Sequence, residues 1–183
     1  MKILDRYIQR LRILKALADI PKNSRVLDIG CAEGDLFKIA GNKIKAGIGI
    51  DPDLKEIIQG ENYILYPGFF PQSLPIVEEF DVITMLAVLE HLGLGEQRQL
   101  AEVISTWLMP QGKLILTVPS SKVDAVLKIM KSLGLIDGMS VDEHHGFNAS
   151  DVPLIFNFSG LSLVKNEKFQ FGLNNLFIFE HRA

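Results

Sequence analysis

Two carboxylates and two glycines stand where apolar runs of the sequence end. Residues 26–34 read VLDIGCAEG, so Asp28 closes one run and Gly30 and Gly34 follow it. Glycines at a strand-to-helix turn let the backbone approach a ligand closely, because no Cβ intervenes. Asp51 closes the next run, 23 residues after Asp28, and an acidic residue at about that distance can bind both hydroxyls of a ribose. The spacing predicts a site for a nucleoside-containing cofactor.

The glycine spacing favours one kind of cofactor over another. Dinucleotide-binding folds use G-x-G-x-x-G, whereas Gly30 and Gly34 form G-x-x-x-G and enclose Glu33, which would repel a pyrophosphate. The pair Gly47 and Gly49 lies inside a predicted strand and lacks a third glycine. The pattern therefore favours a ligand with an amine and no phosphates, and a nicotinamide-dependent oxidoreductase is the weaker alternative.

Alternating elements would position these residues. Apolar periodicity predicts helices over 3–19, 34–40, from 51 onward, 95–108, 121–134 and 150–159, and strands over 25–29, 45–50, 62–66, 81–86, 113–118, 161–171 and 174–181. The first helix would bury Ile3, Leu4, Tyr7, Ile8, Leu11, Leu14, Leu17 and Ala18. Asp53 and Glu56 have capping-box spacing for the helix after Asp51. Strands alternating with helices predict a parallel sheet, closed by an antiparallel hairpin at the C-terminus.

Five segments in this order resemble the class I S-adenosylmethionine-dependent methyltransferases, in the small-molecule (type 11/12-like) branch. Residues 26–34 are similar to the family's first motif, 49–51 to its second-strand motif, and 80–83 with 88–92 to its fourth-strand motif. Residues 108–114 (LMPQGKL) are similar to its L-x-P-G-G-x-L segment, with Gln111 where glycine is usual. No single motif is specific, but the ordered set is.

The resemblance implies a fold and an activity. We expect an α/β, Rossmann-like, seven-stranded and mostly parallel sheet with an antiparallel C-terminal hairpin and helices on both faces. Residues 1–183 would form one methyltransferase domain, with an N-terminal helix over 1–20 and a lid or substrate insertion over 120–147. The reaction would be methyl transfer from S-adenosylmethionine to a small or locally exposed acceptor.

The resemblance also implies cofactor-binding roles for residues at the strand ends. Asp28 would order the loop and help to bind the amino group, and Asp51 would hold the ribose. Phe69 and Phe70 stand where the family usually carries an acidic adenine contact, so they either form an aromatic wall for adenine or belong to the core. The implied cofactor-binding residues are Asp28, Gly30, Cys31, Gly34, Asp51, Pro52, Phe69, Phe70, Leu86, Ala87 and Val88.

Catalytic and substrate-binding residues are predicted in two places. Glu90 and His91 follow the fourth strand, where His91 could act as a general base or the pair could only cap the loop. His144 and His145 lie in an irregular segment, where they could contact the substrate or form an ordinary polar loop. We expect no metal, because no third ligand has suitable spacing.

Composition limits the partners and the location. The net charge of −3, with acidic and basic residues mixed, argues against nucleic-acid binding and fits a small-molecule substrate. We expect a monomer or a homodimer. A single cysteine excludes an intramolecular disulfide. Charged residues interrupt the N-terminal apolar residues, so we expect neither a signal peptide nor a membrane span. We therefore expect a cytoplasmic location. The altered adenine segment leaves one alternative open, a non-catalytic S-adenosylmethionine-binding regulator.

Overall fold

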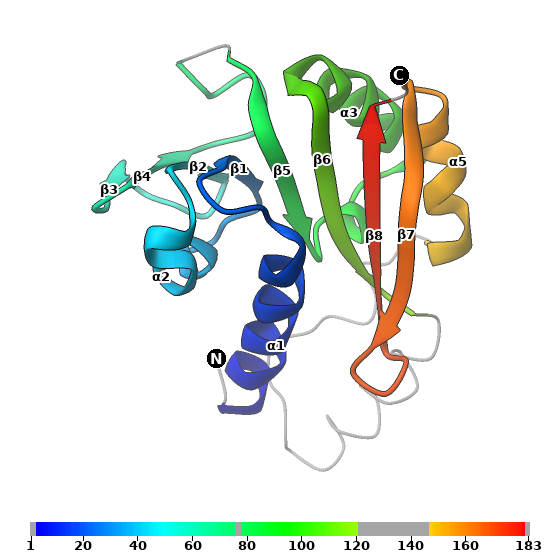
Figure 1. Cartoon of the computed structure of the whole chain (residues 1–183), viewed down its shortest axis with the longest axis horizontal. Coiled ribbons are helices and arrows are strands. Elements are labelled where there is room, and N and C mark those ends of the chain that lie inside the picture. Colours follow the sequence, from blue (N-terminus) through cyan, green and yellow to red (C-terminus); the bar gives the residue numbers. More distant parts are fainter. Residues whose placement is uncertain (1–2, 76–77, 121–146, 182–183) are drawn as a thin grey trace.

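The computed structural model describes residues 3–75, 78–120 and 147–181. Its eight strands form one sheet in the order β3-β4-β2-β1-β5-β6-β8-β7 (Figure 1). The strands are β1 Arg25–Ile29, β2 Ala46–Asp51, β3 Ile58–Gln59, β4 Tyr63–Pro67, β5 Phe80–Leu86, β6 Leu108–Pro119, β7 Leu161–Phe169 and β8 Asn174–His181. The helices are α1 Ile3–Asp19, α2 Asp35–Ala40, α3 Leu94–Trp107 and α5 Val152–Asn157, with short 3-10 turns η1 Gly41–Lys43, η2 Leu89–His91 and η4 Ala149–Asp151.

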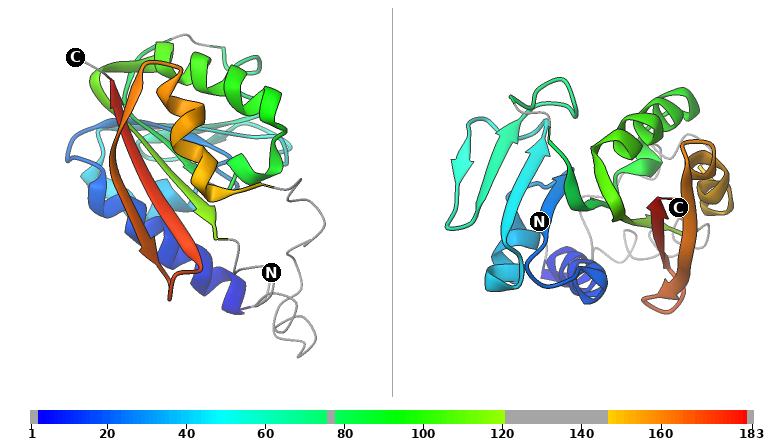
Figure 2. Two further views of the ribbon diagram at one scale, coloured as in Figure 1. Left: turned by 90° about the vertical axis from the view of Figure 1, so that its right-hand side faces the viewer. Right: turned by 45° about the horizontal axis from the view of Figure 1, so that its top comes forward.

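The sheet is parallel in its centre and antiparallel at both ends. The strands β4, β2, β1, β5 and β6 pair in parallel, whereas β3, β8 and β7 join in antiparallel fashion. Figure 2 shows α1 and α2 on one face and α3 and α5 on the other. The predicted Rossmann-like fold with a C-terminal hairpin is confirmed, and β3 makes an eighth strand. The predicted helix over 121–134 and most of the expected insertion over 120–147 lie outside the described residues.

The predicted helix after Asp51 is wrong. The chain leaves β2 through a turn and then forms the two-residue strand β3. The backbone N–H of Asp53 donates to the Asp51 carboxylate at 2.9 Å, so Asp51 closes a local turn where Asp53 and Glu56 were expected to cap a helix. A helix here would be shorter than two turns before Gly60, too short to be stable alone, and the β-branched pair Ile57 and Ile58 favours a strand.

Helix α1 buries a different face from the one predicted. Tyr7, Leu14 and Ala18 are exposed, and the buried residues of its second half are Arg12, Ile13, Ala16 and Leu17. Arg12 lies four residues before Ala16, so its side chain belongs to a row that faces the sheet. An arginine in that row is the main departure from the expected apolar stripe. Within the described ranges, no helix has the length and apolar character needed to cross a bilayer.

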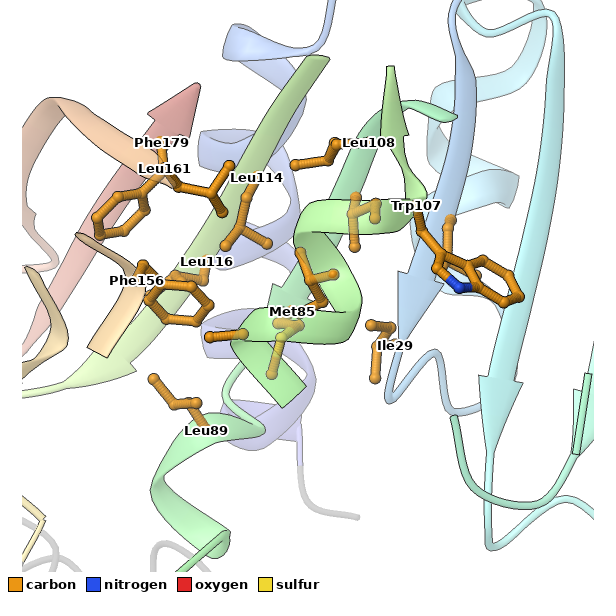
Figure 3. Close-up of a cluster of buried hydrophobic side chains, with 14 of the residues drawn as sticks. Ile29, Met85, Leu89, Trp107, Leu108, Leu114, Leu116, Phe156, Leu161 and Phe179 are labelled. Atoms are coloured by element: carbon orange, nitrogen blue, oxygen red, sulfur yellow. The ribbon is translucent and has the colours of Figure 1, made fainter. Parts of the chain in front are cut away.

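The core on the α3 and α5 side centres on aromatic side chains. The Trp107 ring stacks against Phe80 with centroids 6.3 Å apart and meets the edge of Phe70 at 4.9 Å. Figure 3 shows Trp107 at the border of the cluster, with Met85, Leu116 and Phe156 deeper inside. Trp107 therefore joins the last turn of α3 to the start of β5 and to the segment after β4.

Replacing Trp107 should destabilise the domain strongly. We expect Trp107→Ala to lower the free energy of unfolding by about 3–5 kcal/mol, because a large buried ring is lost and its cavity only partly closes. Gln99→Ala, at an exposed position of the same helix, should change it by less than about 0.5 kcal/mol. Urea unfolding followed by circular dichroism is the measurement, since Trp107 is the only tryptophan. Equal effects of the two substitutions would contradict this view of the core.

Candidate active site

Conformation and packing both require glycine in the loop between β1 and α2. Gly30 and Gly34 each have φ of +77°, in the left-handed region that favours glycine. A Cβ on Gly30 would lie 2.3 Å from Val88 Cγ2, and a Cβ on Gly34 would lie 2.8 Å from Leu65 Cδ1. Side chains from the ends of β4 and β5 thus close over the loop, which brings Val88 beside Gly30.

The Asp51 carboxylate holds this loop in place. One oxygen accepts a hydrogen bond from the Ala32 N–H at 2.8 Å, and the other accepts from the Asp53 N–H at 2.9 Å. Asp51 is half-buried, and each carboxylate oxygen keeps a second lone-pair site. The side chain can therefore still accept from a pair of vicinal hydroxyls, as a ribose would present.

Most amides of the glycine loop are already used inside the protein. The N–H groups of Gly30 and Cys31 donate to the Ile50 carbonyl at 2.9 and 3.2 Å, and Gly34 N–H donates to the Cys31 carbonyl at 2.9 Å. With Ala32 bound to Asp51, four loop amides have partners. Carboxylates at Asp28 and Asp51 flank the loop, so its electrostatics suit an ammonium group better than an anion.

Asp28 is a buried acid on the face covered by α1. Its side chain is 3% exposed, and the Thr84 hydroxyl donates to its Oδ1 at 2.6 Å. Burial raises the pKa of Asp28 to about 7, the Thr84 hydrogen bond opposes this rise, and the charge of Asp51 adds to it. The loop amide of Ala32 donates its hydrogen bond to Asp51, whereas sequence reasoning expected Asp28 to order the loop.

Cys31 lies under the same loop as a small buried residue. A Cβ on Gly49 would meet its sulfur at 2.7 Å. Burial, followed by the charges of Asp28 and Asp51, raises the pKa of the Cys31 thiol. The thiol therefore stays protonated and is a poor nucleophile.

The two phenylalanines after β4 have different environments. Phe70 packs against Trp107 and belongs to the core border. Phe69 is 69% exposed, and the turn that carries it is tied to the site because Gly68 N–H donates to the Asp51 carbonyl at 3.1 Å. Of the two, only Phe69 is mostly exposed, and it follows directly on Gly68, which is bonded to Asp51. Pro52 is exposed in the turn after β2.

The end of β5 and the segment after it bring five predicted residues to the same edge of the sheet. Leu86, Ala87 and Val88 are half-buried, and the Ala87 N–H donates to the Thr117 carbonyl at 2.9 Å with Ala87 at φ +62°. In η2, Glu90 is 3% exposed and His91 is exposed. Glu90 therefore faces the protein interior, and His91 faces solvent.

Sequence reasoning missed Arg12, which lies near Glu90. Arg12 is 9% exposed, and its Nε has no hydrogen-bond partner. Burial lowers the pKa of Arg12, and the charge of Glu90 opposes this shift. The signal was available: Arg12 stands four residues after Ile8 and four before Ala16, in a row that the helix turns inward.

The predicted substrate histidines His144 and His145 lie outside the described residues. Among the residues that are described, no group of three His, Cys, Asp or Glu side chains is placed to hold a metal ion. The roles of these histidines stay predictions.

The buried acid Asp28 should make stability depend on pH. Its pKa of about 7 in the folded chain exceeds the value of 3.8 for an unperturbed aspartic acid side chain, as in the unfolded chain. The folded state therefore holds an extra proton between about pH 4 and 7, and stability falls as pH rises through that window. Asp28→Asn, which resembles the protonated acid, should remove this fall. The free energy of unfolding of Asp28→Asn minus that of wild type should therefore increase by roughly 2–4 kcal/mol between pH 5 and pH 8.

Thermal unfolding of both proteins at each pH measures this difference. Asp53→Asn is the control, because that side chain is exposed. A constant difference between wild type and Asp28→Asn across the range would show that Asp28 is ionised throughout.

Comparisons with known proteins agree with this geometry. The sequence matches the methyltransferase domain family over residues 2–165. A small RNA 2'-O-methyltransferase of Xenopus tropicalis is 26% identical over 132 residues, which covers 61% of this chain and 36% of that protein. The chain thus spans little more than a third of that relative's length.

Solved structures share the fold at low identity. The methyltransferase of Haloferax volcanii in complex with the Trm112 activator has a TM-score of 0.73 at 12% identity, covering 96% of this chain and 91% of that chain. Magnesium protoporphyrin IX methyltransferase of Synechocystis, solved with bound SAH (S-adenosylhomocysteine), has a TM-score of 0.68 at 16% identity, covering 95% and 84%. The match over residues 2–165 is the decisive one: the chain belongs to the methyltransferase domain family.

Proposed function

We propose that this chain methylates a small nucleophilic acceptor at the carboxyl edge of its sheet. The observation that supports this most is the Asp51 carboxylate, which two backbone amides hold at the glycine loop with lone pairs to spare. When bound, S-adenosylmethionine would supply a methyl group activated by a positively charged sulfur, which an acceptor can attack with S-adenosylhomocysteine as the leaving group. The protein's contribution would then be to hold cofactor and acceptor in line at reacting distance.

We assign the cofactor contacts as follows. Asp51 would accept from the ribose hydroxyls, and the exposed ring of Phe69 would stack on the adenine. Asp28 and the loop from Gly30 to Gly34, including Cys31, would surround the amino-acid end. Leu86, Ala87 and Val88 would lie beside the sulfur, because they stand at the end of β5 and directly after it, and Val88 packs against Gly30. Pro52 would fix the turn after Asp51.

The charges near the site favour a small acceptor over a polyanion. Asp28, Asp51 and Glu90 all lie at this edge, Glu33 is exposed in the loop, and the whole chain carries a net charge of −3. A nucleic-acid site usually shows a clustered basic face instead. A cytoplasmic location and a monomeric or homodimeric state, expected from the sequence, accompany this proposal as predictions.

A ribose 2'-hydroxyl of RNA is the second candidate acceptor. It is favoured by one observation, the 26% identity to a small RNA 2'-O-methyltransferase. A non-catalytic S-adenosylmethionine-binding protein is the third possibility, and it predicts cofactor binding without turnover.

One labelling experiment separates these functions. The protein is incubated with S-adenosylmethionine labelled in the methyl group, together with either the low-molecular-weight fraction of a cell extract or its total small RNA. We expect label in small molecules and none in RNA. Label that enters RNA and is lost after ribonuclease treatment would establish the second candidate, and binding of SAH without any transfer would establish the third.

Removing the Asp51 carboxylate should weaken cofactor binding. We expect Asp51→Ala to cost about 1–3 kcal/mol of binding free energy for SAH, because ribose hydroxyls and the Ala32 amide lose their acceptor. Asp53→Ala removes an exposed neighbouring carboxylate and serves as the matched control. Calorimetric titration gives both affinities, and thermal unfolding without ligand shows that each variant is folded. Unchanged affinity in Asp51→Ala would refute the ribose assignment.

His91 should matter only for the chemical step if it acts as a base. Once an acceptor is found, His91→Ala should lower kcat by roughly 100- to 10,000-fold when that acceptor must lose a proton, with SAH affinity unchanged. Glu90→Gln tests the adjacent buried acid in the same assay. A wild-type kcat in His91→Ala would leave His91 with a role in the loop alone.

A further inference from the structure

Three side chains near the carboxyl end of β6 hold polar atoms without hydrogen-bond partners. Thr117 is fully buried and Asn174 is 4% exposed, and neither Thr117 Oγ1 nor Asn174 Oδ1 has a partner within the described part of the chain. The same holds for the Oγ of Ser120, which is half-buried directly after β6. A buried polar atom without a hydrogen bond costs stability. A ligand that bonds these atoms would offset that cost, and we call the three residues the polar cluster.

The sheet places the polar cluster in one region. Thr117 of β6 is opposite Leu176 of β8, which stands two residues after Asn174. Residues two apart on a strand share a face, so Thr117 and Asn174 are diagonal neighbours on that face, with Cα atoms about 7–8 Å apart. The Ser120 N–H donates to the Leu173 carbonyl at 2.8 Å, which holds Ser120 beside the start of β8.

The polar cluster also borders the position proposed for the transferred methyl group. Thr117 is paired with Leu86 in the β5–β6 ladder, and its carbonyl accepts from the Ala87 N–H at 2.9 Å. Leu86 and Ala87 are two of the residues assigned to the sulfur above. The strand order β2-β1-β5-β6-β8 puts the polar cluster on the far side of these residues from Asp51. An acceptor that attacks the methyl group from beyond the sulfur would stand there.

The hydrogen bonds around Asn174 determine which end of its amide is open. The Ile8 carbonyl can only accept, so Gln170 must present its Nε2 to it, at 2.9 Å. Gln170 Oε1 is then the group that accepts from Asn174 Nδ2. Asn174 Oδ1 is therefore the open end, and it can bond only to a hydrogen-bond donor.

Charges near the polar cluster favour a donor that is not anionic. Asp28 lies on the same face of the sheet, two strands away on β1, and the buried Glu90 follows β5. These acids would repel a carboxylate or phosphate. An amine fits better, because it can donate an N–H to Asn174 Oδ1 and keep its lone pair for attack.

The polar cluster itself contains no general base. Hydroxyl and amide groups do not take up a proton near neutral pH, whereas a hydroxyl acceptor would have to lose its proton to become a good nucleophile. A neutral amine needs no such step before it attacks. The composition of the polar cluster therefore suits nitrogen better than oxygen as the attacking atom.

We propose that the polar cluster binds the amino group of a neutral primary or secondary amine, which is the methyl acceptor. The amine donates an N–H to Asn174 Oδ1, beside the hydroxyls of Thr117 and Ser120. Its lone pair forms the new N–C bond while the C–S bond breaks, and the electron pair of that bond leaves on the sulfur of SAH. The methylated ammonium then releases a proton to water. This inference rests on the proposed function and specifies its acceptor.

Stability without any ligand tests the open hydroxyl. Thr117→Val nearly keeps the shape of the side chain and removes an atom without a partner, so it should raise Tm by about 2–6 °C. Thr84→Val is the contrasting variant, because the buried Thr84 hydroxyl donates to Asp28 at 2.6 Å, and it should lower Tm. A lower Tm in Thr117→Val would show that the protein already bonds this hydroxyl, and would overturn the polar cluster as a ligand site.

The chemistry of the product tests the acceptor. Each protein is incubated with the low-molecular-weight fraction of a cell extract and with S-adenosylmethionine whose methyl carbon is isotopically labelled. The NMR shift of that carbon reports attachment to nitrogen, oxygen or carbon, and we expect nitrogen. Asn174→Leu should lower the initial rate by roughly 10- to 100-fold and leave the affinity for SAH unchanged, and Thr117→Val should lower the rate in the same way. Asn166→Leu, at an exposed position of β7, should behave as wild type.

The outcomes separate this inference from the proposed function. Methyl groups on oxygen or carbon, or a wild-type rate in Asn174→Leu, would overturn the amine assignment and leave methyl transfer intact. Weaker SAH binding by Asn174→Leu or Thr117→Val would also overturn it, because the polar cluster would then belong to the cofactor site. If wild type binds SAH but transfers no methyl group, the proposed function fails, and this inference fails with it.

Discussion

The site depends on Asp51, where three strand ends meet. Its carboxylate accepts from the amide of Ala32 in the loop after β1 and from Asp53 in its own turn, and its carbonyl accepts from Gly68 after β4. These hydrogen bonds hold the loop after β1 close to the turns that follow β2 and β4. Val88 packs against Gly30 and Leu65 against Gly34, so only glycine fits at these two positions. The glycine motif therefore reflects this packing as much as the need for space around a ligand.

A row of polar side chains crosses the α1 side of the sheet near the strand ends. Asp28, Thr84, Thr117 and Asn174 are all buried, and alternation along each strand places them on the same face as Val26, Val82, Ile115 and Leu176. The opposite face at this level is apolar, with Met85 and Leu116. Buried polar atoms without partners reduce stability, and this row contains two of them, Thr117 Oγ1 and Asn174 Oδ1.

Much of this fold follows from sequence periodicity, and the exceptions have physical causes. The strands near 25–29, 46–51 and 80–86 were predictable because buried parallel strands are continuous apolar runs. The false helix after Asp51 arose because a cap signal looks the same whether it starts a helix or closes a turn. In the site, Asp51 could be predicted from its spacing, whereas Arg12 could not be assigned a partner, because the nearby charge of Glu90 comes from a segment far away in the sequence.

The two borders of the sheet are protected from self-association by different means. At one border β3 has only two residues, Ile58 and Gln59, which is too short to template a strand from another molecule. At the other, the nine-residue β7 carries Lys165, Glu167 and Lys168 along its length. Charged side chains, lysine above all, discourage pairing between exposed strands of separate chains. Because the chain after β2 forms β3 and not the predicted helix, the described part of the sheet ends on that side in a two-residue strand.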